Sequence, residues 1–166
     1  MPVTPPHVDP ATIDTTKTLV DHAGIYALIP HRHEMQMLTA IVCEWPDQKI
    51  IVGYKDVRDD EFWVRGHFPE KSVMPGVLMC EAAAQLTGFY THRHKISRGV
   101  LIGLGGIDNS RFRRPVLPGE RLLLIAKGLR VKPRVTLFNV QGFVDGDMAF
   151  ETDIMGVVLA RTGSGD

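Results

Sequence analysis

One stretch of the chain decides the fold: residues 77–90, which read VLMCEAAAQLTGFY. The stretch is apolar almost all round, no proline interrupts it, and the charges in residues 92–98 end it. Pro75 and Gly76 stand directly before it, and proline fits the first turn of a helix because the amides of that turn have no helical partner. The pattern predicts one long helix that is buried on most of its faces.

Further along the chain, short runs rich in β-branched residues and leucine predict strands. Asp145-Gly146, between the last two runs, indicates a two-residue hairpin because glycine tolerates the positive φ of such a turn. One helix followed by several strands predicts an α+β domain with an antiparallel sheet curled around the helix. The predicted strands are residues 49–54, 100–104, 121–129, 135–144 and 148–159.

The two ends of the chain differ from this domain. Four prolines in the first ten residues make that part a poor helix or strand former, so we expect a flexible tail over residues 1–18. Residues 19–29 predict a short helix that stops before Pro30. We expect a single domain over residues 19–161 and a flexible end over residues 162–166.

Composition narrows the class of protein. Of the 166 residues, 44% are apolar and 23% are charged, as in soluble domains, and nineteen basic residues balance nineteen acidic ones. This balance argues against a nucleic-acid-coating protein. No run approaches the roughly 18 apolar residues of a membrane span, and the N-terminus does not resemble a secretory signal. With only two cysteines in the sequence, we expect free thiols in the reducing cytoplasm.

A carboxylate lies in the middle of the apolar helix. Glu81 has apolar residues on both sides, and burying an unpaired charge costs on the order of several kcal/mol. Glu81 must therefore be paired, protonated or functional. We expect burial to raise the pKa of Glu81 toward neutral pH, which suits acid/base catalysis. Gln85 lies four residues on, where it can orient Glu81 by a hydrogen bond.

The residues before the helix supply two further chemical groups. His67 lies in residues 66–69 (GHFP), and histidine takes up and releases protons near physiological pH. Residues 75–77 (PGV) leave free amides at the positive end of the helix dipole, where an oxyanion can be held. A base, an acid and an oxyanion site together can remove an α-proton from a thioester and expel a β-hydroxyl, with no metal or organic cofactor.

This segment resembles the signature of a known enzyme family. Residues 66–85 follow GHFPxxxxMPGVLxxEAxAQ, which is similar to the 3-hydroxyacyl-acyl-carrier-protein dehydratases of FabZ type, including the fourteen-residue step from His67 to Glu81. The related FabA-type dehydratase/isomerases have Asp at the position of Glu81. The resemblance covers roughly residues 22–160. Its other matches are residues 29–32 (IPHR), 111–116 (RFRRPV), 118–120 (PGE) and 144–146 (VDG).

The resemblance implies a hot-dog fold, in which a curved antiparallel sheet wraps the long central helix. It also implies a homodimer with active sites at the subunit interface, and a hexamer built as a trimer of dimers is a larger assembly to test. In this scheme His67 removes the α-proton and the partner's Glu81 handles the departing hydroxyl, while the acyl chain lies in a tunnel between the two helices. The substrate arrives on the phosphopantetheine of acyl carrier protein, or as acyl-CoA. The expected site residues are His67 and Glu81 (catalytic), Gly76 and Val77 (thioester-binding), and Phe68, Pro75 and Gln85 (supporting).

Two segments depart from the family pattern. Residues 33–41 read HEMQMLTAI where the family usually has YPFLLVDRV, so the aromatic residues and an Asp-Arg pair of this loop are missing. Residues 70–72 read EKS where Gly-x-Pro is usual. In the family the first loop borders the acyl tunnel, so the sequence leaves the preferred acyl length open.

Several residues have a second interpretation. Glu81 could pair with an arginine such as Arg65. The histidine pairs within residues 31–33 and 92–94 lack cysteine or carboxylate partners at ligand spacing, so no metal site is expected. A cluster of three arginines is either a solvated strand face or a docking site for the acidic carrier protein or its phosphate. These arginines are Arg111, Arg113 and Arg114.

The function expected from the sequence is dehydration of carrier-bound 3-hydroxyacyl thioesters to trans-2-enoyl thioesters in fatty-acid synthesis. One alternative is a hot-dog acyl-CoA hydratase or thioesterase, and a thioesterase would release free thiol without an enoyl product. A second alternative is a non-catalytic acyl-binding or regulatory module. The presence of both His67 and Glu81 speaks against the second alternative.

Overall fold

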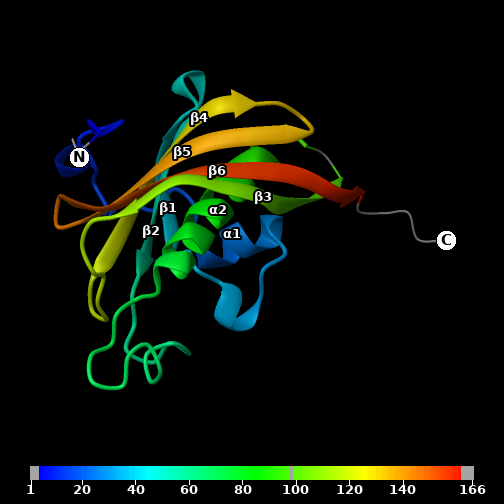
Figure 1. Cartoon of the computed structure of the whole chain (residues 1–166). Coiled ribbons are helices and arrows are strands. Elements are labelled where there is room, and N and C mark those ends of the chain that lie inside the picture. Colours follow the sequence, from blue (N-terminus) through cyan, green and yellow to red (C-terminus); the bar gives the residue numbers. More distant parts are fainter. Residues whose placement is uncertain (1–3, 98, 162–166) are drawn as a thin grey trace.

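The computed structural model describes residues 4–97 and 99–161. Six strands form one antiparallel sheet in the order β1-β2-β4-β5-β6-β3, and the long helix α2 lies in its concave side with the short helix α1 beside it (Figure 1). This architecture confirms the predicted α+β class and the hot-dog fold. The helices are α1 (His22–Leu28) and α2 (Gly76–Arg93), with 3-10 turns at Pro10–Thr12, His33–Met35 and Pro46–Gln48. The strands are β1 (Ala40–Trp45), β2 (Ile50–Asp56), β3 (Val100–Phe112), β4 (Arg121–Val131), β5 (Val135–Val144) and β6 (Asp147–Arg161).

Helix α2 forms the centre of the main core, as predicted. It begins one residue earlier and ends three residues later than the stretch that predicts it. Its buried side chains pack in one cluster with the inward-facing residues of the sheet, and burying each large apolar side chain stabilises the fold by about 1.5–3 kcal/mol. The largest members of this cluster include Leu86 and Phe89 from α2 and Leu122, Phe138 and Phe150 from the sheet.

Helix α1 also follows its sequence signals. The carboxylate of Asp21 accepts a hydrogen bond from the Gly24 amide at 2.8 Å, which caps the first turn. The helix ends before Pro30, within the predicted residues 19–29. In the part of the chain that the structure describes, no helix is both long and apolar enough to cross a membrane.

Two strands differ from the prediction. Strand β1 is absent from it because a bulge between Ile41 and Cys43 and a polar end break the alternation of apolar and polar residues. Strand β3 is eight residues longer than predicted, because its glycines weaken the strand pattern. These glycines allow close contact with β6: a Cβ on Gly103 would lie 2.3 Å from the side chain of Leu159.

The hairpin between β5 and β6 has the predicted turn. Asp145 and Gly146 adopt φ values of +53° and +86°, so both occupy the left-handed region that this turn requires. The turn sets the register of β5 against β6, and β6 in turn pairs with β3 at the edge of the sheet. The short sequence signal thus positions the strand that borders the candidate site.

The N-terminal segment covers the outer face of the sheet, where a second apolar cluster lies. Val8 and Ile13 pack against this cluster, and the Gln141 side chain accepts from the His7 amide at 2.9 Å and donates to the Pro5 carbonyl at 3.0 Å. Part of the segment that the sequence predicts to be a flexible tail thus contacts the sheet, because proline lacks an N–H but its carbonyl still accepts. The remaining tail expectations, for residues 1–3 and 162–166, lie outside the described residues.

Candidate active site

His67 lies on the long loop between β2 and α2 and is held by backbone groups. Its amide donates to the carbonyl of Trp63 at 2.8 Å, and its carbonyl accepts from the amide of Val73 at 2.8 Å. Its ring Nδ1 lies 2.7 Å from the Val73 carbonyl oxygen. A carbonyl can only accept, so Nδ1 carries a proton, and in the neutral imidazole Nε2 then keeps its lone pair. This is the tautomer that a general base needs.

The predicted oxyanion site lies in the same cavity as His67. This cavity has a volume of about 530 Å³, and its lining includes Gly76, Val77 and Phe112. A volume of this size can hold a small-molecule ligand. Pro75 provides no side-chain cap, and among the described residues none accepts a hydrogen bond from the amides of Gly76 or Val77. A Cβ on Gly76 would lie 2.9 Å from the Phe112 ring, so a larger residue here would have to displace that ring.

The supporting residue Phe68 lies directly against the candidate base. Its ring stacks on the imidazole of His67 with 4.0 Å between the ring centroids, and the Phe68 side chain is half-exposed. The stacking restricts rotation of the imidazole, which the Nδ1 contact to Val73 also holds. The sequence thus placed His67, Phe68 and the helix entrance in one site, and the structure brings them together.

Glu81 projects from α2 into a different environment from the one predicted. Its Oε1 accepts a hydrogen bond from Gln85 Nε2 at 2.8 Å, as predicted, and lies 3.4 Å from Nε2 of His31. The His31 contact, helped by Gln85, lowers the pKa of Glu81 and outweighs the burial that would raise it. The expectation of a raised pKa is therefore wrong for the single chain, because its carboxylate is partnered. Among the described residues Glu81 forms no ion pair with Arg65.

Gln85 is fully buried, and both the nitrogen and the oxygen of its side-chain amide form hydrogen bonds. Its Nε2 also donates to the Met35 carbonyl at 2.6 Å, while its Oε1 accepts from the Tyr26 hydroxyl at 2.9 Å and the Met37 amide at 3.1 Å. Burial raises the pKa of Tyr26 to about 12, so its hydroxyl stays protonated and can donate. The same hydroxyl accepts from the amide of Leu38 at 2.8 Å. These partners leave only one orientation for the Gln85 amide.

Sequence reasoning missed two members of this network. Tyr26 lies on the predicted helix of residues 19–29, but nothing in that stretch indicates that its hydroxyl reaches α2. His31 lies in the IPHR segment, and its match to the family motif was the signal that could have singled it out. Only the folding of the chain brings these two residues to Gln85 and Glu81. Tyr26, for example, is separated from Gln85 by 59 positions in the sequence.

The structure does not bring His67 and Glu81 of one chain into a common cavity. Glu81 lines a separate cavity of about 130 Å³, together with His31 and His92. This cavity follows the part of α2 that the sheet leaves partly uncovered, whereas His67 lies at the helix entrance. The partly uncovered stripe of α2 consists of Val77, Glu81, Ala84, Gly88 and His92.

The three arginines do not form one solvated face. Arg113 pairs with Glu151, and Arg114 pairs with Glu120 at 2.5 Å. Both line the His67 cavity, so their charges are partnered within the chain, and their predicted docking role stays a prediction. Arg111 is exposed, and its guanidinium donates only to the neighbouring Ser110 carbonyl within the described chain.

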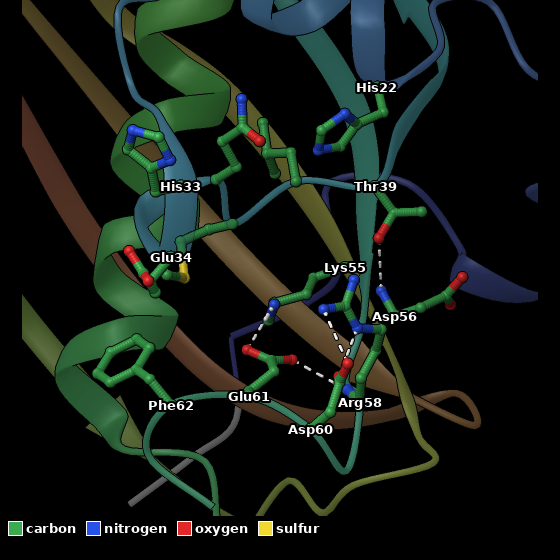
Figure 2. Close-up of a pocket in the computed structure, with 13 residues that line it drawn as sticks. His22, His33, Glu34, Thr39, Lys55, Asp56, Arg58, Asp60, Glu61 and Phe62 are labelled. Atoms are coloured by element: carbon green, nitrogen blue, oxygen red, sulfur yellow. Dashed lines mark hydrogen bonds and ion pairs between the residues drawn. The ribbon is translucent and has the colours of Figure 1, made fainter.

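The atypical loop borders a third cavity, which holds none of the predicted site residues. This cleft of about 430 Å³ lies between the loop of residues 33–39, the end of β2 and residues 58–62 (Figure 2). Its charges are largely paired: Lys55 lies 2.9 Å from Glu61, and Arg58 lies 2.8 Å from Asp60. Across the described residues, no three His, Cys, Asp or Glu side chains are arranged to hold a metal.

Comparison with known proteins places this site in a family. The sequence profile of the FabA-like domain matches residues 29–153, which is most of the chain. The chain belongs to the FabA-like family. Its curated relatives include 3-hydroxyacyl-acyl-carrier-protein dehydratases FabZ from Mannheimia succiniciproducens, 35% identical over 82% of this chain and 91% of the relative, and from Polynucleobacter asymbioticus, 36% identical over 86% and 95%. The resemblance to FabZ-type dehydratases is thus confirmed.

Solved structures support the fold of this FabA-like protein. The dehydratase heterocomplex ApeI:P from Xenorhabdus doucetiae superposes with a TM-score of 0.68 at 17% identity, covering 81% of this chain and 90% of that one. Cj0977, a sigma28-regulated virulence protein from Campylobacter jejuni, superposes with a TM-score of 0.66 at 16% identity, covering 90% and 98%. At these identities the likeness concerns the fold alone.

Proposed function

We propose that this FabA-like protein is a hydro-lyase that converts 3-hydroxyacyl thioesters on acyl carrier protein to trans-2-enoyl thioesters in fatty-acid synthesis. The names of its curated relatives support this reaction. The observation that carries the proposal is the 2.7 Å contact between His67 Nδ1 and the Val73 carbonyl oxygen. In the neutral imidazole this contact places the proton on Nδ1 and leaves Nε2 with its lone pair, and no hydrogen bond reaches Nε2 among the described residues. The unpartnered amides of the helix entrance share the cavity with this base.

The first step is removal of the α-proton. His67 Nε2 takes the proton from the carbon next to the thioester carbonyl, and the electron pair of that C–H bond moves toward the carbonyl oxygen. The amides of Gly76 and Val77 donate to this oxygen as negative charge develops on it, and the positive end of the α2 dipole adds to the stabilisation. Pro75 supports this step because it begins the helix without capping those amides.

The second step is loss of the β-hydroxyl. Glu81 of the partner subunit gives a proton to the hydroxyl, the C–O bond breaks, water leaves, and the electron pair from the α-carbon forms the double bond. In the free chain the His31 contact lowers the pKa of Glu81. A bound acyl chain and a second subunit would exclude water from the carboxyl, which favours its protonated form.

We propose a homodimer, because one chain holds the two catalytic groups in different cavities. Strand β3 is an edge of the sheet and exposes apolar side chains, an arrangement that favours pairing with another strand. The partly uncovered stripe of α2 runs beside that edge and would face the second copy. The exposed apolar residues at this edge are Leu101, Leu104, Ile107 and Phe112.

The remaining parts of the proposal concern substrate delivery. The acyl chain would lie along the cavity between α2 and β3, and Arg111 is the arginine with an exposed charge for a carrier or its phosphopantetheine phosphate. The reaction as written moves only protons and one hydroxyl, so the proposal includes no metal or organic cofactor. Cys43 and Cys80 are free thiols, which agrees with the proposed cytoplasmic location.

The test replaces each catalytic group while keeping the fold. His67→Ala and Glu81→Gln should each reduce formation of enoyl thioester from 3-hydroxyacyl carrier protein by at least ~100-fold, the lower end of general acid/base contributions. His33→Ala and Glu70→Gln, two exposed positions outside the proposed site, serve as matched controls and should retain activity.

Each outcome separates the alternatives. Near-wild-type rates in both site variants would contradict the assigned roles. Free thiol released from simple acyl thioesters, with no enoyl product from 3-hydroxyacyl thioesters, would favour the thioesterase. Acyl binding without either product would favour the non-catalytic module. Comparing carrier-bound with CoA-bound substrates then distinguishes the dehydratase from an acyl-CoA hydratase.

A further inference from the structure

Local contacts of the backbone hold His31 in place, apart from its contact with Glu81. Its carbonyl accepts from the Arg32 guanidinium at 2.7 Å, and the same guanidinium nitrogen donates to the Ile29 carbonyl at 3.0 Å. The Gln36 side chain also points to the His31 carbonyl, at 3.4 Å. These contacts fix the backbone around Pro30, so the imidazole is directed toward α2 by local structure.

His31 and Gln85 approach the same oxygen of Glu81. The Gln85 amide nitrogen donates to Oε1 at 2.8 Å, and His31 Nε2 lies 3.4 Å from Oε1. The second distance is long for a hydrogen bond, so it is an electrostatic contact in the free chain, of the kind that tightens when substrate binds. Within the described residues, no hydrogen bond or ion pair reaches the other oxygen, Oε2.

We propose that His31 is a positioning residue that, together with Gln85, directs the transferable proton of Glu81 onto Oε2. Once the His31 contact tightens on substrate binding, Oε1 faces two N–H donors and cannot also carry a proton, because the hydrogens would meet. Gln85 cannot rotate its amide to relieve this constraint, since Tyr26 and Met37 donate to its oxygen. Oε2 is therefore the oxygen that gives the proton to the substrate hydroxyl.

This inference rests on the proposed role of Glu81 as the acid. His31 makes no contact with the proposed base: it lies in the Glu81 cavity, whereas His67 lies in the other. Removing the His31 donor should therefore affect turnover through Glu81 alone. Substrate binding should change little, so kcat should fall while KM stays close to the wild-type value.

The test compares three histidine variants. His31→Phe keeps a ring but removes the N–H, and should lower kcat by about tenfold, the scale of one hydrogen bond to a charged group. His31→Gln places an amide nitrogen near the position of Nε2 and should recover most of that loss. His33→Gln is the matched control, because His33 is exposed two residues away and lines the other cleft.

Two further measurements separate positioning from a general structural effect. In an NMR titration, the midpoint of the Glu81 carboxyl should move to higher pH in His31→Phe and stay near wild type in His31→Gln. Only His31→Phe loses a donor to the carboxylate. In a Glu81→Gln background, His31→Phe should cause no further loss. A tenfold loss that persists in that background, or an unmoved titration, would overturn the inference. An active Glu81→Gln enzyme would instead overturn the proposed function.

Discussion

The two halves of the candidate site are held by different kinds of contact. His67 is fixed by backbone groups of its own loop, from Trp63 and Val73, within a few residues along the chain. Glu81 is fixed by side chains and carbonyls from three separate segments: α1, the loop that follows it, and α2. The proposed base thus depends on local chain geometry, whereas the proposed acid depends on how distant segments pack.

This difference indicates where each half tolerates change. Side-chain substitutions around His67 leave the backbone carbonyl that orients its ring in place. Substitutions around Glu81 remove the contacts themselves, because the network is built mainly on the Gln85 and Tyr26 side chains. The loop of residues 33–41, where the sequence departs most from the family, joins the network only through backbone groups. The departures therefore leave the Glu81 half intact.

The largest expected effect comes from combining a His67 variant chain with a Glu81 variant chain in one dimer of the proposed kind. His67→Ala and Glu81→Gln homodimers should each be nearly inactive, but a mixed dimer would hold one site with both groups intact. Random mixing makes about half of the dimers mixed, so activity should recover to about a quarter of wild type. Co-expression with two different affinity tags, followed by an enoyl-thioester assay, measures the recovery. A pure mixed dimer with no activity would place both groups of a site in one subunit.

A smaller effect is expected from breaking the network around Glu81. Gln85→Leu keeps the volume but leaves the Tyr26 hydroxyl, the Met35 carbonyl and the Met37 amide without their partner. The free energy of unfolding should fall by about 3 kcal/mol, and turnover should fall with it. Val73→Ala, which keeps the carbonyl bound to His67, should have much less effect on turnover. Urea denaturation and the dehydration assay test both, and equal losses of turnover would contradict the contrast.

The smallest effect concerns the pH dependence of stability. The folded chain lowers the pKa of Glu81 below its unfolded value, so this carboxylate stabilises the fold fully above the unfolded value, about 4.3 for glutamate. The contribution is lost as the pH falls through the lower folded pKa. Wild type should therefore lose stability relative to Glu81→Gln on acidification below about pH 4.3. Unfolding curves for both proteins at several pH values measure this difference, and a constant difference would contradict it.

Sequence alone predicted the parts of the site that helix periodicity and local signals determine. The Glu81–Gln85 hydrogen bond follows from their four-residue spacing on a helix, and the amides of the helix entrance follow from Pro75 and Gly76. The sign of the pKa shift of Glu81 did not follow, because it depends on His31, which lies fifty residues earlier. Burial alone would have raised that pKa, and the partner reversed the result.

The same distinction applies to the fold. The sequence predicted the elements that carry a pattern of their own. These are helix α2, the strands with regular alternation and the Asp145-Gly146 hairpin. The sequence did not predict strand β1, because its bulge interrupts the alternation of apolar and polar residues. Pairing with β2 holds this segment as a strand in the folded protein. The predicted strand ended at residue 104 because glycines weaken a strand pattern, but in β3 the glycines are needed where β6 side chains cross the strand closely.

The N-terminal segment has a consequence for how the molecule behaves in solution. Val8 and Ile13 cover an apolar patch on the convex side of the sheet, far in the sequence from His67 and Glu81. A shortened chain that began at Leu19 would retain His67 and Glu81 but would expose that apolar patch to solvent. Exposed apolar patches promote aggregation. We therefore expect the described part of this segment to limit aggregation at high protein concentration, an effect that an activity measurement on dilute protein would overlook.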